Sequence, residues 1–302
     1  MRFDVSELKT ANECGRKWMY SSRNAMHLRP KVQNDNLFFG SLFHECLHAL
    51  YLGGNPDKIV EQAVRECQGD ITMQKVITAM IRGYATEVLP DDLERYRVID
   101  IEHSVHFTTS VIDPKDGKPI EVCGSIDMVC IEKVTNLVWG FEHKTCSKFR
   151  PDIYIMLDEQ PRTYDIELQK FADALNKEYE MKFHEPGPYK VGGIFINEVK
   201  KVQRKFEYKR SKCCYSSIER ENFKKKLDRM AAHLLEMREG NDGLCECSPG
   251  YLKCQMCDYA SLCLTYRDME VDLPELLEEF AEEYEVRECD HLDEKVERRI
   301  EG

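Results

Sequence analysis

The chain has 302 residues, of which 42% are hydrophobic and 32% charged, a composition that excludes a disordered polypeptide. No run of 18 apolar residues occurs, and the N-terminal segment MRFDVSELKT lacks the apolar core of a signal peptide, so we expect neither a membrane span nor secretion. The net charge of −12 lies almost wholly in residues 268–302, which hold 15 acidic and 4 basic residues, so the nearly neutral remainder can still bind nucleic acid. Fourteen cysteines in such a chain favour reduced, metal-binding thiols and a cytoplasmic protein over a disulfide framework.

The first third of the chain is predicted to be helical. Ser6 precedes apolar residues at helical spacing, which predicts one helix over residues 6–21 that carries Cys14. Apolar residues that recur every three or four positions predict a second helix over residues 37–52 and further helices within residues 56–95.

The middle of the chain is predicted to form a sheet with helices. Residues 98–107, 119–132 and 136–145 are rich in Val, Ile, Phe and Trp and are separated by DPKDG and KVTN, which predicts three consecutive antiparallel strands. The expected elements that follow are a helix over 157–178, a strand over 191–197, another strand near Phe206 and a helix over 216–239.

The last third combines basic, cysteine-rich and acidic segments. Lysines and arginines gather between Lys200 and Arg229, which predicts a basic face for DNA or, alternatively, an ordinary solvated surface. Tyr208, Tyr215 and Phe223 in this segment could stack bases or pack in the core. We expect a cysteine-rich loop over residues 245–263 and one amphipathic acidic helix over LPELLEEFAEEYEV.

Two carboxylates and a lysine are predicted to meet on the central strands. A hairpin loop centred on Val134 and Thr135 places Asp127 opposite Glu142, and Lys144 lies on the same face as Glu142. Two opposed carboxylates repel each other unless a cation lies between them, and hard oxygen ligands suit Mg²⁺ or Mn²⁺. Taken alone, the same residues could form a surface salt bridge.

The order of these residues resembles the PD-(D/E)xK nucleases of the RecB-like type. The matching blocks are FGSLFHECL with Gly40 and His44, CGSIDM with Gly124 and Asp127, FEHKT with Glu142 and Lys144, and QPRTY with Gln160 and Tyr164.

The resemblance implies roles for these residues. His44, Asp127, Glu142 and the carbonyl of His143 would bind the metal, and Lys144 would be the catalytic lysine. Gln160 and Tyr164 would orient Lys144 or contact the DNA backbone. His48, which shares a helix face with His44, is the other candidate histidine ligand.

A second constellation lies near the C-terminus. Cys254, Cys257 and Cys263 form a C-x2-C-x5-C pattern that can surround one metal centre. Together with Cys14 they resemble the four cysteines of the iron–sulfur subgroup of the same nucleases, which implies a [4Fe-4S] cluster. The alternative is a zinc site formed by Cys245, Cys247, Cys254 and Cys257.

These expectations define a fold and a function. The fold is a mixed α/β, restriction-endonuclease-like core whose sheet is flanked by helices, with an N-terminal helical arm and a C-terminal iron–sulfur loop. The expected domain limits are 1–267 for one nuclease domain (arm 1–96, core 97–240, closing segment 245–267 with Cys14) and 268–302 for an acidic helix or tail. The resemblance implies a Mg²⁺- or Mn²⁺-dependent exonuclease that cuts single-stranded or free-ended DNA to 5′-phosphates, with a helicase or recombination protein as a partner. The alternatives are a DNA-binding subunit of a recombination, repair or CRISPR-adaptation complex, and a redox-sensing iron–sulfur protein.

Overall fold

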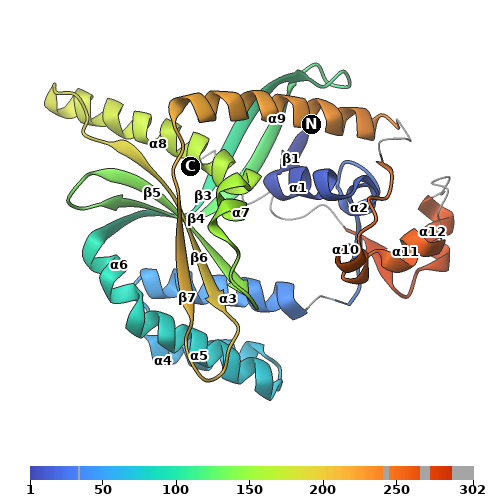
Figure 1. Cartoon of the computed structure of the whole chain (residues 1–302), viewed down its shortest axis with the longest axis horizontal. Helices are drawn as coiled ribbons and strands as arrows, with labels where there is room; N and C mark the ends of the chain where they lie inside the picture. The colour runs from blue at the N-terminus through green and yellow to red at the C-terminus, as the bar shows by residue number, and fades with distance from the viewer. Residues whose placement is uncertain (33–34, 241–244, 266–272, 288–302) are drawn as a thin grey trace. The chain divides into compact units, whose positions relative to one another are not determined.

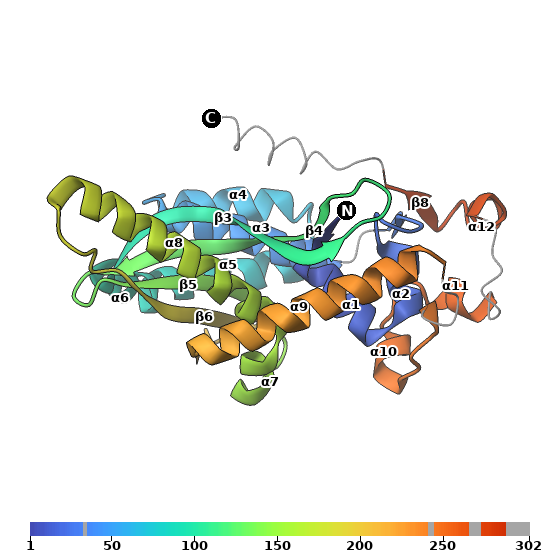
Figure 2. The same ribbon diagram turned by 90° about the horizontal axis from the view of Figure 1, so that it is seen from above.

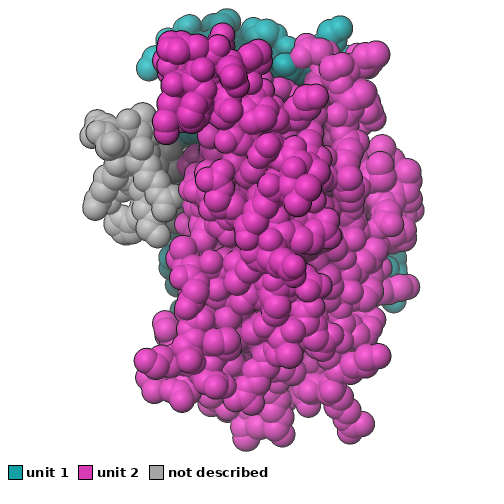
Figure 3. All heavy atoms as spheres, turned by 90° about the vertical axis from the view of Figure 1, so that its left-hand side faces the viewer, with its two compact units in different colours: residues 1–33, 106–124, 224–302 teal, residues 34–105, 125–223 magenta. Residues whose placement is uncertain are grey.

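The computed structural model describes residues 1–32, 35–240, 245–265 and 273–287. The chain divides into two compact units, which Figure 3 shows in different colours. Unit 1 comprises residues 1–33, 106–124 and 224–302, and unit 2 comprises residues 34–105 and 125–223. Among the described residues, no helix is both long enough and apolar enough to cross a membrane.

Six strands form a mixed β-sheet (Figure 1): β1 (Arg2–Asp4), β3 (Tyr96–Ile112), β4 (Pro119–Glu132), β5 (Leu137–Cys146), β6 (Lys190–Lys200) and β7 (Tyr208–Cys213). The strand order is β1-β4-β5-β6-β7, and β3 pairs with β4. β4 and β5 are antiparallel, β5 and β6 parallel, and β6 and β7 antiparallel. The predicted mixed α/β fold is therefore confirmed.

The register of the central hairpin agrees with the prediction. Met128 pairs with Phe141, and the pairing continues without a break to Ile131 and Val138. One step further along this register, Asp127 stands opposite Glu142. The positions of the two carboxylates therefore follow from strand pairing.

The helices of unit 2 are α3 (Asp35–Tyr51), α4 (Pro56–Glu66), α5 (Ile71–Glu87), α6 (Leu89–Arg95), α7 (Asp152–Leu157) and α8 (Glu159–Phe183). The start of α4 is set by Asn55, whose side chain accepts the backbone N–H groups of Asp57 and Lys58. Buried residues of α3 and α5 form one apolar core with Trp139, Phe141 and Phe195 of the sheet. α7 and α8 supply the crossover that the parallel pair β5 and β6 requires.

The predicted helix over residues 6–21 is two helices, α1 (Val5–Glu13) and α2 (Gly15–Ser21). The prediction was wrong at Cys14, whose backbone is extended, with φ −165° and ψ 112°. This conformation interrupts the helix, so Cys14 lies at a junction between helices instead of on a helix face.

The C-terminal part of unit 1 also differs from its prediction. Its elements are α9 (Ser217–Arg238), α10 (Tyr251–Gln255), α11 (Ala260–Thr265), α12 (Leu273–Glu279) and β8 (Tyr284–Val286), and the first residues of α9 belong to unit 2. The strand that pairs with β8 is β2 (Leu28–Pro30), near the N-terminus. The single acidic helix over residues 273–286 was wrong, because β8 pairs antiparallel with β2. Phe280 and Tyr284 join an apolar cluster with Leu28 and Tyr259, and this packing outweighs the helical pattern. Residues 268–272 and 288–302 of the expected tail lie outside the described residues.

Candidate active site

Three charged side chains from two neighbouring strands meet in unit 2. The backbone N–H of His143 on β5 donates a hydrogen bond to Oδ2 of Asp127 on β4 at 2.6 Å. Lys144 lies on the same face of β5 as Glu142, and its Nζ is 2.5 Å from Oε1 of Glu142. The structure thus brings together the three side chains that the register predicts on one face.

Glu142 is a buried carboxylate with one unpaired oxygen. Glu142 is 2% exposed, and its burial raises the pKa of its carboxyl group to about 7. The positive charge of Lys144 lowers this pKa, and the negative charge of Asp127 raises it further. Within the described residues, Oε2 of Glu142 has no hydrogen-bond partner. An unpaired buried carboxylate oxygen is costly. Such an oxygen fits a hard divalent cation such as Mg²⁺ or Mn²⁺.

His44 on α3 approaches Asp127 from the helical side. Its Nδ1 lies 3.5 Å from Oδ1 of Asp127. Burial lowers the pKa of His44, but the hydrogen bond and charge of Asp127 outweigh it and raise the pKa. The alternative histidine, His48, instead places Nδ1 3.6 Å from Oε1 of Glu102. The geometry therefore favours His44 as a neighbour of the carboxylates.

Gln160 and Tyr164 lie one turn apart on α8. Nε2 of Gln160 donates to Oε1 of Glu142 and to the hydroxyl of Tyr164, both at 2.9 Å. Asp158 caps α8 by accepting the backbone N–H of Gln160. Gln160 therefore orients Glu142, and Tyr164, which is 3% exposed, supports Gln160 from the interior.

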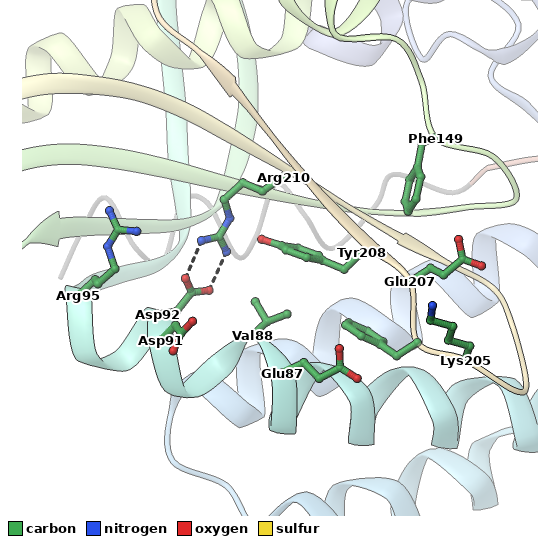
Figure 4. A pocket seen from close by; sticks show the side chains of 11 residues that line it. Glu87, Val88, Asp91, Asp92, Arg95, Phe149, Lys205, Glu207, Tyr208 and Arg210 are labelled. Atoms are coloured by element: carbon green, nitrogen blue, oxygen red, sulfur yellow. Dashed lines mark hydrogen bonds and ion pairs between the residues drawn. The ribbon is translucent and has the colours of Figure 1, made fainter.

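His143 connects the site to a buried polar network. Nδ1 of its imidazole lies 3.2 Å from the side-chain amide nitrogen Nδ2 of Asn197. Burial lowers the pKa of the His143 imidazole to about 3. Nε of Arg210 donates to the amide oxygen of Asn197 at 2.7 Å. The guanidinium of Arg210 binds both oxygens of Asp92 at 2.6 and 2.7 Å (Figure 4). Asp92 also accepts the hydroxyl of Tyr51 at 2.6 Å, so a continuous chain of hydrogen bonds lies behind β5.

The network borders a cavity of about 400 Å³. Arg210 and Tyr208 from β7 and Asp92 from α6 lie on its wall, and Figure 4 shows Arg210 directly paired with Asp92. Arg210 belongs to the segment expected to form a basic DNA-binding face or a solvated surface, and its ion pair with Asp92 fits neither interpretation.

Two lysines of the basic segment are paired with carboxylates within the protein. Lys200 pairs with Glu207, and Lys209 pairs with Asp152, both at 2.6 Å. The expected stacking aromatics also have internal roles. Tyr208 donates to Asn197, Tyr215 donates to the carbonyl of Met156, and Phe223 is 3% exposed.

Arg150 is a residue near the site that the sequence analysis missed. Its Nε lies 2.8 Å from Oε1 of Glu198, which is 1% exposed, and Nη1 lies 3.6 Å from Oδ2 of Asp158. Its charge acts on the pKa of Lys144. A single arginine belongs to no recognisable sequence motif. The only indication would have been the pairing of β5 with β6, which places Glu198, the partner of Arg150, beside Lys144.

Five thiols line a separate cavity in unit 1. The cavity of about 560 Å³ is bordered by the predicted ligands Cys14, Cys254, Cys257 and Cys263, and also by Cys247. Sγ of Cys247 lies 3.7 Å from Sγ of Cys263. Cys245 lies elsewhere, with its thiol 3.9 Å from the carbonyl of Met237, so the proposed zinc set of Cys245, Cys247, Cys254 and Cys257 is not assembled.

Two further groups border the thiols. Nη1 of Arg16 lies 3.9 Å from Sγ of Cys263. The hydroxyl of Tyr20, also on the cavity wall, is buried and has no partner among the described residues. No three of these thiols lie within 4.8 Å of one another.

One group of three metal-ligating side chains is compact in the described part of the chain. His106, Glu121 and Cys123 in unit 1 have ligand atoms within 4.8 Å of one another. Nε of Arg2 lies 3.4 Å from the carboxylate of Glu121 and offsets its charge. This mixed thiol, imidazole and carboxylate group is distinct from the oxygen-rich site at Glu142.

The chain is similar to a known protein family and to solved structures. No curated protein matches the chain. The crystal structure of SSO0001 is 12% identical, with a TM-score of 0.41 over 87% of this chain and 85% of that one. A provisionally named exonuclease from Eubacterium rectale is 11% identical, with a TM-score of 0.45 over 91% of this chain and 92% of that one. The model of the PD-(D/E)XK nuclease superfamily matches residues 2–264, a span that holds both the carboxylate site and the cysteines, and the chain therefore belongs to the PD-(D/E)XK nuclease superfamily.

Proposed function

We propose that the protein is a metal-dependent exonuclease that hydrolyses phosphodiester bonds of single-stranded or free-ended DNA and leaves 5′-phosphates. The observation that carries the proposal is the meeting of Asp127, Glu142 and Lys144, with one oxygen of Glu142 buried and unpaired. Membership of a nuclease superfamily supports hydrolysis of nucleic acid as the reaction.

Asp127 and Glu142 would hold Mg²⁺ or Mn²⁺, with His44 and the carbonyl of His143 as further ligands. The bound metal would supply positive charge at the scissile phosphate. The oxygen donors and the unpaired Oε2 of Glu142 fit this ion.

Lys144 and Gln160 complete the site. Lys144 keeps its ammonium against Glu142, from where it can orient the attacking water or offset charge that develops on the phosphate. Gln160 donates a second hydrogen bond to Oε1 of Glu142, and this bond fixes the orientation of the carboxylate and therefore the position of Oε2. The backbone N–H of His143 fixes Asp127 in the same way.

We further propose that Cys14, Cys254, Cys257 and Cys263 hold a [4Fe-4S] cluster of the RecB-like type. Four thiols on one cavity wall, with Arg16 to offset their negative charge, support this assignment. In this proposal residues 1–267 act as one nuclease domain, and a helicase or recombination protein supplies unwound DNA.

The test is cleavage of end-labelled single- and double-stranded DNA by anaerobically purified protein with Mg²⁺ or Mn²⁺. We expect a ladder of 5′-phosphate products from the wild type and none from Glu142→Ala. The position of the label in the products gives the polarity. Binding without cleavage by protein whose iron content is complete would favour the alternative, a DNA-binding subunit of a larger complex.

A further inference from the structure

Three side chains with different metal-binding groups meet on β3 and β4, within unit 1. His106 lies on β3, and Glu121 and Cys123 lie two residues apart on β4, the strand that pairs with β3. One ligand atom of each lies within 4.8 Å of those of the other two. Because residues two apart on a strand share a face, Glu121 and Cys123 extend from the same side of the sheet. The imidazole of His106 joins them from the neighbouring strand.

The thiol and the imidazole have the spacing of two ligands of one ion. Sγ of Cys123 lies 3.7 Å from Nδ1 of His106. Around a tetrahedral zinc ion, a sulfur and a nitrogen at their usual bond lengths lie about 3.6 Å apart. Without a metal the same contact is a weak hydrogen bond. The pair is therefore held near its ligand geometry before an ion arrives.

Pairing with a third strand fixes the carboxylate of the group. β1 pairs parallel with β4 and aligns Arg2 with Glu121, and Figure 2 shows the N-terminus beside the hairpin of β3 and β4. Nε of Arg2 lies 3.4 Å from Oε2 of Glu121. A carboxylate that ligates a metal is commonly held by a hydrogen bond from a second group. Arg2 can hold one oxygen of Glu121 in this way while the other oxygen binds the ion.

The burial of the three side chains leaves a route for an ion. Ile120 and Val122 on the opposite face of β4 are fully buried, whereas His106 and Glu121 are partly exposed. Cys123 is 9% exposed and forms the inner end of the group. An ion can therefore enter from solvent past the imidazole and the carboxylate. A cysteine buried in this way is a poor candidate for a reactive nucleophile.

The donor set selects the kind of metal. Thiolate, imidazole and carboxylate are the groups that bind zinc in proteins. Mg²⁺ and Mn²⁺ prefer oxygen ligands, and a thiolate disfavours them. The group at Cys123 and the carboxylates Asp127 and Glu142 therefore suit different ions.

We propose that His106, Glu121 and Cys123 bind one Zn²⁺ ion, with a water molecule as the fourth ligand. The ion connects β3 to β4 and stabilises the folded chain, because an ion that needs ligands from two strands binds the folded state. The site uses none of the residues assigned to the proposed nuclease and iron–sulfur sites, so the inference depends on neither of them.

The test counts zinc by mass spectrometry in the anaerobically purified full chain, after dialysis against Zn²⁺ in the presence of excess Mg²⁺. The Mg²⁺ competes for the oxygen-rich site, and zinc in the thiol cavity is counted equally in every variant below. We expect the wild type to hold one zinc ion more per chain than Cys123→Ala or His106→Ala. Competition with a zinc chelator should show a loss of affinity beyond about 100-fold, since outer residues alone cost roughly 10- to 100-fold.

The matched control is Cys130→Ala, which removes another buried thiol from the same strand. It should hold as much zinc as the wild type. Equal zinc in the wild type, Cys123→Ala and His106→Ala overturns the site. Zinc loss from both cysteine variants but not from His106→Ala also overturns it, because disturbed packing of β4 then explains the loss. If Cys123→Ala does not fold, His106→Ala and Glu121→Gln decide, since both change partly exposed side chains.

Discussion

Lys144 and Gln160 donate hydrogen bonds to the same atom, Oε1 of Glu142, at 2.5 and 2.9 Å. The other oxygen, Oε2, is buried and has no partner among the residues that the structure describes. The two donors thus divide the carboxylate into one oxygen that the protein holds and one that is left for the proposed cation. This division explains why a charged group is retained at a position that is 2% exposed.

The first prediction concerns Glu142→Gln. We expect the rate of DNA cleavage to fall roughly 100- to 1000-fold or more, because losing one group that stabilises charge in a transition state typically lowers a rate by this factor. The metal-free variant should unfold at a lower temperature than the wild type, because Lys144 loses its counter-charge. Rates on labelled oligonucleotides and thermal unfolding check both points. Glu61→Gln, an exposed glutamate of α4, should change neither, and wild-type cleavage by Glu142→Gln would exclude Glu142 as a ligand.

The second prediction concerns Gln160, which touches Glu142 and acts through it. We expect Gln160→Ala to raise the Mg²⁺ concentration needed for half-maximal activity about 10- to 100-fold, as is typical of residues that orient metal ligands. Affinity for DNA measured without metal should not change. Gln169→Ala, on an exposed part of the same helix, is the control. A loss of DNA affinity without a change in metal dependence would instead make Gln160 a backbone contact.

The carboxylate site could be predicted because it depends on local geometry. The loop around Val134 and Thr135 determines which residues pair, and alternation along β5 determines that Glu142 and Lys144 share a face. Gln160 and Tyr164 follow from helical spacing in the same way. These relationships span few residues, so the sequence contains the information that specifies them.

The contacts that were missed join distant parts of the chain. Arg210 lies in a run of lysines and arginines, and nothing in that run shows that Asp92, 118 residues away, neutralises it. Cys247 enters the thiol cavity through folding of a segment without periodicity. The extended backbone at Cys14 and the pairing of β8 with β2 are likewise set by tertiary packing, which overrides local helical patterns.

The third prediction separates the five thiols of unit 1. We expect Cys257→Ser to lose bound iron and visible absorbance and to unfold at a lower temperature, because the proposed cluster would connect Cys14 to the C-terminal cysteines. Cys247→Ser should retain iron, since Cys247 is the fifth thiol and lies against Cys263. Cys245→Ser is the control outside the cavity. If Cys247→Ser loses iron while Cys14→Ser retains it, Cys247 is the fourth cluster ligand and Cys14 is not a ligand.

The fourth prediction concerns the network behind β5. Asp92 is 3% exposed and accepts hydrogen bonds from Arg210 and Tyr51, so Asp92→Asn leaves a buried guanidinium without its counter-charge. We expect the free energy of unfolding in urea to fall by about 3 kcal/mol. Asp91→Asn changes an exposed neighbour on the same helix and should have no effect.

The double variant Asp92→Asn with Arg210→Met tests the cause of that loss. It removes the unpaired cation, so part of the lost stability should return. Because Arg210 binds Asn197 and Asn197 binds His143, the single variant should also slow cleavage at temperatures where it is fully folded. Full activity together with the loss of stability would show that the network supports the fold and leaves the position of Asp127 and Glu142 unchanged.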